Sequence, residues 1–522
     1  MIEQTGARQI FRIDAMALAA AAATLICAAP ALAVIGFAFT PGEATRFGGA
    51  LLRDGALGTL GLVLAGGGGA IILGAGAAWL VSLCAFPGRG LFEWLLVIPL
   101  AAPVYVLAYA YSGLTWAGGA IPFRVEGFWG AAFVYAIGLY PYVYLAARAA
   151  FASQSSCALE AARTLGAKPA TVFFRVGLPL ARPGIVAGGV LALMEIAADY
   201  GAAHHFGLTT LSTAVFRAWY AHQNAHGALQ IAAVLLIAAL VFLIIERRAR
   251  GRAGFAGGST RWRALPRYAL SPAAGAGAFV FCATLVTLGA ALPLGWLAAI
   301  AVDHTYVAEL RRALFNSVAL GSVGALFTLA LAAIIAVSAR RSGVMGKASL
   351  FAAGMGYAAP GAVLALGAFS LFGVAREYGW IAGIGAGLAL PTLIWAYAAR
   401  FAAAGAQPID AGLARLSKGL DASARTLGAS PARRLWRVDL PIAAPSLAAA
   451  ALILFVDILK ELPATLIIRP FNFDTLAVIA YSYASDEQLE LAAAPSLLIF
   501  LAGIAPILML TRGIAQSRAG QR

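Results

Sequence analysis

Long apolar runs recur along the whole chain, and short polar segments with most of the charged residues separate them. Most runs reach the roughly 18 to 20 residues that a helix needs to cross the ~30 Å hydrocarbon core of a bilayer. Because the runs are continuously apolar and do not alternate with period two, they predict helices rather than barrel strands. The predicted spans are 15–39, 56–85, 91–116, 128–148, 184–207, 228–245, 273–301, 314–338, 348–373, 379–399, 446–468 and 489–511.

The composition agrees with a membrane as the solvent of this chain. Of its 522 residues 62% are hydrophobic and only 11% are charged, whereas soluble domains carry about a quarter charged residues. The predicted fold is therefore an all-α polytopic membrane protein with about 12 transmembrane helices. The cysteines lack the spacing of a disulfide framework or a zinc site; they are Cys27, Cys84, Cys157 and Cys282.

The distribution of positive charge predicts the orientation. With both termini in the cytoplasm, 28 of the 37 Lys and Arg residues fall in predicted cytoplasmic segments or, in the case of Arg148, at the cytoplasmic end of a span. Eight fall in outer loops, and one, Lys460, lies deep inside a span. This asymmetry follows the positive-inside rule. The N-terminal run, preceded by Arg8 and Arg12, has some features of a cleavable signal peptide, but its length favours a retained first helix.

An arginine-rich stretch from Glu246 to Arg267 divides the chain into two sets of six spans. Its Gly, Ser and Pro content predicts a cytoplasmic linker. The predicted divisions are a first half at 1–250 with its core at 55–247, a basic linker at 251–270, and a second half at 271–522 with its core at 311–511. The net charge of +15 raises nucleic-acid binding as an alternative, but charge beside spans favours contact with membrane lipid and no nucleic-acid partner.

One polar segment is present in both halves. Residues 162–183 and 424–445 are identical at 14 of 22 positions, and each copy lies between the fourth and fifth spans of its half. Duplication with the same orientation predicts two parallel, pseudo-symmetric halves related by an axis along the membrane normal. In each copy a glycine followed by a proline predicts a helix, a tight turn and a second helix outside the bilayer. An amphipathic connector lying on the lipid headgroups is the alternative.

The first copy resembles the EAA loop of binding-protein-dependent ABC importer permeases. The residues that match the family pattern are Glu160, Ala161, Ala162, Gly166 and Leu178-Pro179. In the second copy Ala422 replaces the glutamate, and Asp421 stands one place earlier. The resemblance implies that both loops dock on a cytoplasmic ATP-binding subunit present in two copies. The docking residues that it implies are Glu160, Ala161, Gly166, Pro169, Asp421, Gly428 and Pro431.

The stretch from Lys460 to Val478 is most similar to the ferric-iron branch of the fused, two-loop permeases. The resemblance implies a multi-pass permease of the bacterial inner membrane, without a cofactor, that passes Fe(III) from a periplasmic substrate-binding protein to the cytoplasm. Thiamine, a polyamine or another small solute is an alternative substrate, and an ion-gradient-driven secondary transporter is an alternative class. The sequence contains no GxxxxGK[ST] P-loop, so we expect ATP hydrolysis in a separate subunit and no enzyme activity in this chain.

Two acids four residues apart follow each repeated loop, and they coincide under a 262-residue offset: Glu195 with Asp457, and Asp199 with Glu461. On a continuous helix such residues share one face, so each pair is expected to point one way. Because charged groups within a membrane usually face a bundle interior or a water-filled route, these acids are candidates to line the path of a cation. Two structural alternatives remain, namely a salt bridge with Lys460 and caps of helix ends.

Two further features follow the acidic spans. His204 and His205 are candidate iron ligands, although an interfacial role fits a histidine pair at the end of a span better; metal ligands stay unassigned. The pairs Thr210-Leu211 and Thr475-Leu476 lie at similar positions, but three residues off the 262-residue offset. They suit either outer gate-lining segments or simple loops.

Overall fold

The computed structural model of the 522-residue chain describes residues 15–40, 46–115, 124–152, 164, 169–253, 267–303, 306–341, 343–379, 386–413, 426, 437 and 440–517. The described part is helical apart from one parallel pair of two-residue strands, β1 (Cys84–Ala85) and β2 (Tyr268–Ala269). The chain is thus an all-α polytopic membrane protein, as its sequence predicts.

In the first half, helices long enough to span a membrane alternate with short ones, and one span is broken. The elements are α1 (Ala15–Ala38), α2 (Arg46–Leu83), α3 (Arg89–Leu95), the 3-10 helix η1 (Ile98–Ala101), α4 (Val104–Thr115), α5 (Gly127–Ala152), α7 (Pro169–Val172), the π-helical turn η2 (Phe173–Gly177), α8 (Leu178–Ala198), α9 (Gly201–His205), α10 (Leu211–Phe216), the π-helical turn η3 (Arg217–Ala221) and α11 (Ala225–Ala253).

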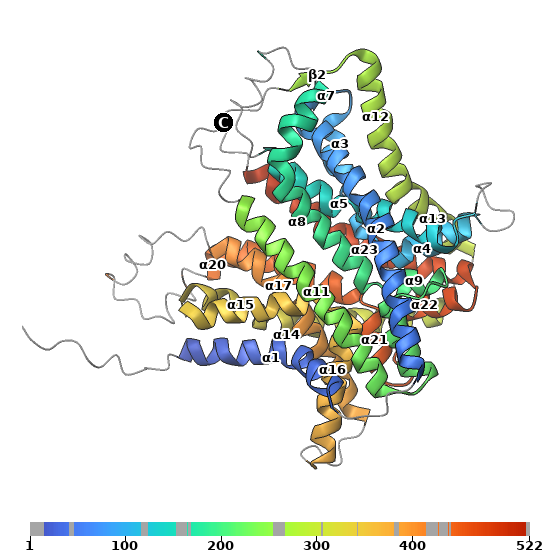
Figure 1. Cartoon of the computed structure of the whole chain (residues 1–522), viewed down its shortest axis with the longest axis vertical. Helices are drawn as coiled ribbons and strands as arrows, with labels where there is room; N and C mark the ends of the chain where they lie inside the picture. Colours follow the sequence, from blue (N-terminus) through green and yellow to red (C-terminus); the bar gives the residue numbers. More distant parts are fainter. Residues whose placement is uncertain are drawn as a thin grey trace, which may run out of the picture.

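The second half repeats this order after β2. Its elements are α12 (Pro272–Val286), the π-helical turn η4 (Thr287–Ala291), α13 (Leu292–Asp303), α14 (Val307–Arg341), α15 (Gly343–Ala358), α16 (Gly361–Glu377), the 3-10 helix η5 (Ala386–Leu388), α17 (Ala389–Leu413), α20 (Leu440–Leu459), α21 (Pro463–Ile468), α22 (Leu476–Ser485) and α23 (Leu489–Ser517). Figure 1 shows α2, α8 and α12 running along the long axis of the molecule, while α1, α14 and α15 lie across it.

Among the described residues, nine helices are long and apolar enough to cross a membrane. Two bent pairs raise the number to eleven: Arg89–Ala101 with Val104–Thr115, at 92°, and Val344–Ala358 with Gly361–Glu377, at 113°. The remaining predicted span, 379–399, corresponds to α17, which begins ten residues later than expected and contains Arg400 and Asp410.

Glycines let α2 approach its neighbours closely. A Cβ at Gly66 or Gly69 would press on Tyr135 or Ala136 of α5, and one at Gly67 would overlap Leu193 of α8. Small residues of this kind allow membrane helices to pack through their backbones. This packing fixes α5 and α8, and with them the polar side chains described below.

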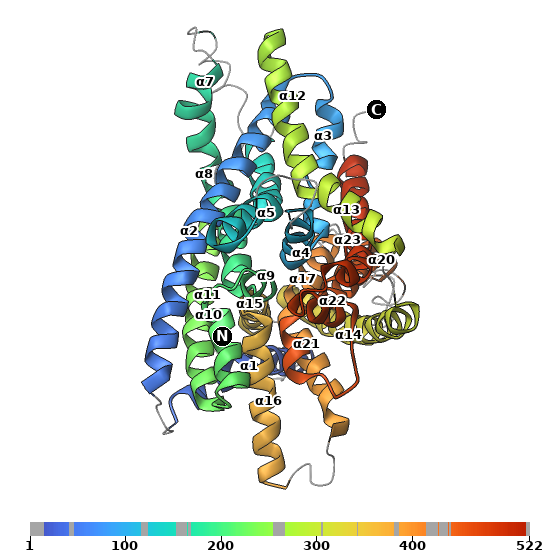
Figure 2. The same cartoon turned by 90° about the vertical axis from the view of Figure 1, so that its right-hand side faces the viewer.

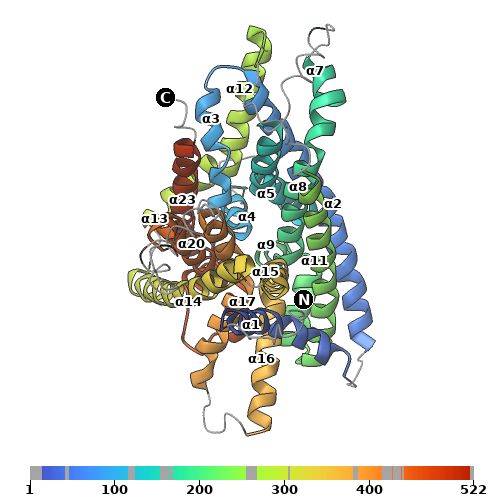
Figure 3. The same ribbon diagram turned by 90° about the vertical axis from the view of Figure 1, so that its left-hand side faces the viewer.

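The first helix of each half packs on helices of the opposite half. α1 lies against α15 and α16 (Figure 3), whereas α12 contacts α3 and α13 contacts α4 (Figure 2). The Trp395 indole N–H donates to the Ile26 carbonyl at 2.9 Å, and Gly367 leaves room for the Pro30 carbonyl. The segment at 251–270 therefore divides the sequence into two repeats, but the helices of the two repeats pack against each other. The domain boundaries remain a prediction.

Candidate translocation site

The predicted docking residues lie almost entirely outside the described residues. Pro169 is described as the first residue of α7, in agreement with a proline that restarts a helix. The docking role of the whole set remains a prediction. The residues outside the description are Glu160, Ala161, Gly166, Asp421, Gly428 and Pro431.

A polar cavity of about 120 Å³ lies where helix breaks from both halves meet. The α3–α4 and α8–α9 breaks contribute the first-half wall, and the α15–α16 and α20–α21 breaks contribute to the second. Broken helices at the junction of two repeats are typical of substrate sites in transporters. The charged residues that line this inner cavity are Glu195, Asp199, Arg400, Asp457, Lys460 and Glu461.

Asp199 caps the short helix that follows the first-half break. α8 ends at Ala198, and Asp199 itself has an extended backbone (φ −70°, ψ 132°). Its Oδ2 accepts the backbone N–H groups of Ala202 at 2.9 Å and Ala203 at 3.2 Å, as well as the Tyr135 hydroxyl at 2.8 Å. The carboxylate thereby satisfies donors that the start of α9 would otherwise leave free.

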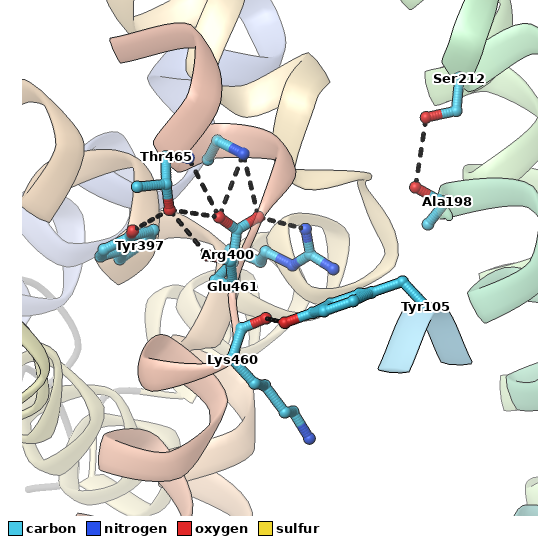
Figure 4. Close-up of polar contacts among 9 residues, drawn as sticks. Tyr105, Ala198, Ser212, Tyr397, Arg400, Lys460, Glu461 and Thr465 are labelled. Carbon is cyan, nitrogen blue, oxygen red and sulfur yellow. Dashed lines mark hydrogen bonds and ion pairs between the residues drawn. The ribbon is translucent and has the colours of Figure 1, made fainter. Parts of the chain in front are cut away.

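Glu461 makes the same cap in the second half (Figure 4). Its carboxylate accepts the N–H of Ala464 at 3.1 Å and that of Thr465 at 3.2 Å, three and four residues on, as in the first half. The Arg400 guanidinium adds an ion pair at 3.1 Å. The Thr465 hydroxyl also bonds Glu461 and contacts the Tyr397 hydroxyl at 2.6 Å.

The prediction that each acid pair shares the face of one continuous helix is wrong. α8 ends before Asp199, and α20 ends at Leu459, before Glu461. In each case the second carboxylate takes up backbone N–H groups of the next helix, which competes with continuation of the first. In the second half Pro463 is the first residue of α21, where its missing N–H costs no intrahelical hydrogen bond. All four acids nevertheless line the same cavity.

The remaining acids of the cavity differ in their partners. Asp457 pairs with Lys460 at 2.9 Å, so the predicted alternative of a salt bridge with this lysine is confirmed for Asp457. The Lys460 carbonyl accepts the Tyr105 hydroxyl from the first half at 3.2 Å. Across the described part of the chain, the Glu195 carboxylate has no hydrogen bond or ion pair.

Arg400 is a site residue that the sequence interpretation missed. A predicted span ending at 399 counted it among the cytoplasmic charges, whereas α17 continues to Leu413 and places it in mid-helix, with its side chain 15% exposed. The internal repeat contains a signal that places Arg400 in a helix. Adding the 262-residue offset to the bounds of α5, 127–152, gives 389–414, and position 400 lies within this range. Gly361, at the α15–α16 break, leaves the space that the Arg400–Glu461 pair occupies.

A second, larger cavity of about 390 Å³ includes both predicted histidines in its lining. His205 Nε2 lies 2.7 Å from the Ser112 hydroxyl, and His204 packs against Tyr200 and Tyr481, whose hydroxyls are 2.7 Å apart across the two halves. Among the described residues, no three His, Cys, Asp or Glu side chains are grouped so as to hold a metal ion. Aromatic contacts run from Tyr105, which lines the inner cavity, through Tyr109 to His205, which lines this second, outer cavity.

The two Thr-Leu pairs are structural equivalents despite their imperfect sequence offset. Thr210 caps α10, and the next N–H donates to the Thr59 hydroxyl of α2 at 2.8 Å. Thr475 caps α22, and the next N–H donates to the Ser317 hydroxyl of α14 at 2.7 Å. Each pair thus ties a short helix to the long second helix of its half.

Comparison with known proteins matches these features. The family model of the binding-protein-dependent transport system inner membrane component matches residues 70–249. The Fe(3+)-transport system permease protein FbpB 2 of Haemophilus influenzae is 26% identical over 456 residues, which cover 85% of this chain and 87% of that protein. The molybdenum transport system permease protein ModB of Escherichia coli is 31% identical over 196 residues, 34% of this chain and 86% of ModB. The putative 2-aminoethylphosphonate transport system permease protein PhnV of Salmonella typhimurium is 33% identical over 114 residues, 22% of this chain and 42% of PhnV.

Two repeated halves with broken helices around a polar cavity define the class as a membrane transporter. The chain belongs to the binding-protein-dependent transport system inner membrane components, the permease family of ABC importers. It is a multi-pass inner-membrane protein, and its membership implies an ATP-binding partner and a substrate-binding partner.

Proposed function

We propose that this chain forms the translocation pathway of an iron(III) importer. A periplasmic binding protein delivers Fe(III), and two copies of a cytoplasmic ATP-binding subunit dock on the repeated loops. The observation that carries the choice of a cation is the inner cavity, where four carboxylates face two cationic side chains. The match to FbpB 2 along 85% of the chain supports the same substrate.

The surplus of negative charge argues for a cation over an oxyanion. Two unit charges 4 Å apart interact by on the order of 4 kcal/mol at an effective dielectric constant near 20. A formal charge of −2, from four carboxylates less Arg400 and Lys460, is therefore enough to favour a cation and to repel an oxyanion. This argument favours the substrate named for FbpB 2 over those named for ModB and PhnV.

The energy enters through the docking loops of the proposed importer. The sequence has no P-loop, so the partner subunits hydrolyse ATP, and their closure moves the two halves relative to each other. The proposed contacts are Glu160, Ala161, Gly166 and Pro169 in the first loop and Asp421, Gly428 and Pro431 in the second. In this proposal both termini lie in the cytoplasm. The linker at 251–270, which joins the halves at 1–250 and 271–522, lies there as well.

Transport in proteoliposomes tests the substrate. The chain is reconstituted with its ATP-binding subunit and its iron-loaded binding protein, and uptake of radioactive iron is followed. We expect uptake that requires ATP and the partner subunit, with no ATP hydrolysis by the chain alone. Uptake driven by a proton or sodium gradient without the ATPase would place the chain among secondary transporters. Uptake of molybdate or thiamine in place of iron would overturn the choice of substrate.

The docking loops have their own test. Gly166→Val and Gly428→Val should uncouple ATP hydrolysis from uptake, because the tight turns expected from the sequence need a positive φ that a β-branched residue adopts poorly. Gly68→Val in α2 is a suitable control, since a Cβ at Gly68 meets no atom within 4 Å. Normal coupled uptake by the Gly166→Val, Gly428→Val double variant would show that the loops are ordinary connectors.

A further inference from the structure

The two walls of the inner cavity carry different net charge although their backbones are repeated. On the first-half wall Glu195 and Asp199 are the charged residues, which gives a formal charge of −2. On the second-half wall Asp457 and Glu461 are balanced by Lys460 and Arg400. At the corresponding first-half positions, 262 residues earlier, the sequence has Ala198 and Gly138. The negative surplus of the whole cavity therefore comes from one wall.

We infer that the transported cation is held against the first-half wall and that Glu195 is the carboxylate that contacts it and selects for positive charge. This inference rests on the proposed function. Glu195 stands in the repeat where Asp457 stands, but Asp457 is held by Lys460. Glu195 has Ala198 at the position that corresponds to this lysine.

The other carboxylates have structural partners. Asp199 accepts two backbone N–H groups and the Tyr135 hydroxyl through Oδ2. Glu461 is engaged by two backbone N–H groups and by Arg400. The first wall therefore offers one carboxylate that has no hydrogen bond or ion pair among the described residues, half-buried at the edge of a polar cavity whose opposite wall carries Arg400 and Lys460.

A single free carboxylate suits a site of passage. Hard cations prefer oxygen ligands such as carboxylates, and an ionised side chain within a membrane is favoured when it faces a route for ions. Conduction requires binding that is favourable enough to admit an ion but weak enough to release it. A cage of several acids would hold Fe(III) too tightly, whereas Glu195 with a neutral wall opposite allows release.

Charge substitutions in the reconstituted transporter distinguish a direct contact between Glu195 and the cation from a general requirement for negative charge in the cavity. Glu195→Gln should lower iron uptake at least tenfold while ATP hydrolysis stimulated by the binding protein is retained, and Glu195→Asp should recover much of the uptake. The comparison variant is Asp457→Asn with Lys460→Met, which keeps the second wall neutral and should lower uptake by a smaller factor than Glu195→Gln does. The matched control is Glu377→Gln at the exposed end of α16, outside the cavity, which should leave uptake unchanged. Thermal unfolding of each purified variant confirms that the fold is intact.

A second variant copies the second-half arrangement onto the first wall. Ala198→Lys places an ammonium three residues after Glu195, as Lys460 follows Asp457, and should abolish iron uptake. Ala198→Met, of similar length and uncharged, should keep more than half of it. Full uptake by Glu195→Gln, or an equal loss in the Asp457→Asn, Lys460→Met variant, would overturn the inference while leaving the proposed function intact. Failure of the unaltered transporter to take up iron would overturn both.

Discussion

At the α8–α9 break Asp199 is held by uncharged donors, whereas at the α20–α21 break Glu461 is also held by the guanidinium of Arg400. The backbone N–H groups that each carboxylate accepts lie three and four residues further along in both cases. The cap is thus common to the two halves, and the added cation belongs to one. The same local geometry therefore leads to different penalties when the carboxylate is removed.

The largest expected effect is that of Glu461→Ala. It removes the cap of α21 and leaves Arg400 buried without its counter-ion, and breaking a buried pair in this way destabilises by roughly 3 to 5 kcal/mol. Unfolding of the purified protein in detergent, followed by circular dichroism, measures the loss. Replacing Arg400 by Leu in the same chain should recover part of the stability, because the stranded charge is then gone. A loss no larger than that of the first-half counterpart would contradict the assignment of a buried ion pair.

Asp199→Ala should have a smaller effect, of about 2 kcal/mol, near the upper end for loss of a helix cap. No cation is stranded, although the Tyr135 hydroxyl loses its acceptor. The same unfolding assay applies, and Asp199→Asn is the control, because an amide oxygen can still accept the N–H groups of α9. If Asp199→Asn is as unstable as Asp199→Ala, the charge of this residue matters more than its capping.

The smallest effect is expected for the tyrosines that stand at matching positions in α5 and α17. Tyr135→Phe removes a hydrogen bond to the Asp199 carboxylate, and Tyr397→Phe removes one to the Thr465 hydroxyl. Each change should destabilise by about 0.5 to 1.5 kcal/mol, and Tyr135→Phe should be the larger because its acceptor is charged. Equal unfolding midpoints for the two variants would show that the charge of the Asp199 acceptor does not strengthen the hydrogen bond of Tyr135 relative to that of Tyr397.

Much of this architecture was available from the sequence. The apolar runs predicted a polytopic helical protein, and the repeated segment with its following acids predicted two related halves. The sequence leaves the helix breaks open, because Glu195 and Asp199 stand at a spacing that a continuous helix also satisfies, and capping of helix ends is only one of the alternatives for these acids. Each helix ends where a carboxylate accepts N–H groups of the next helix, and the pattern of apolar residues does not show this contact.

Other features depend on contacts far along the chain. Hydropathy places Arg400 in a loop, because the apolar run ends at 399 whereas α17 continues for another fourteen residues to Leu413. The capping role of Thr210 and Thr475 was open because their pairs match only imperfectly in sequence. Nothing in the local pattern of α1 indicates which half it packs on, since an apolar helix fits a lipid or a protein surface equally well.

The crossed packing of α1 has a consequence for how the protein is made. The hydrogen bond between Ile26 and Trp395 joins residues 369 positions apart. At a synthesis rate of about 5 to 20 residues per second, α1 leaves the ribosome roughly 20 to 70 s before its partner exists. During that interval it must reside in lipid or be held by an insertion factor. Its 24 residues contain no charged side chain, so the newly made helix can wait in the bilayer at little energetic penalty until the second half arrives.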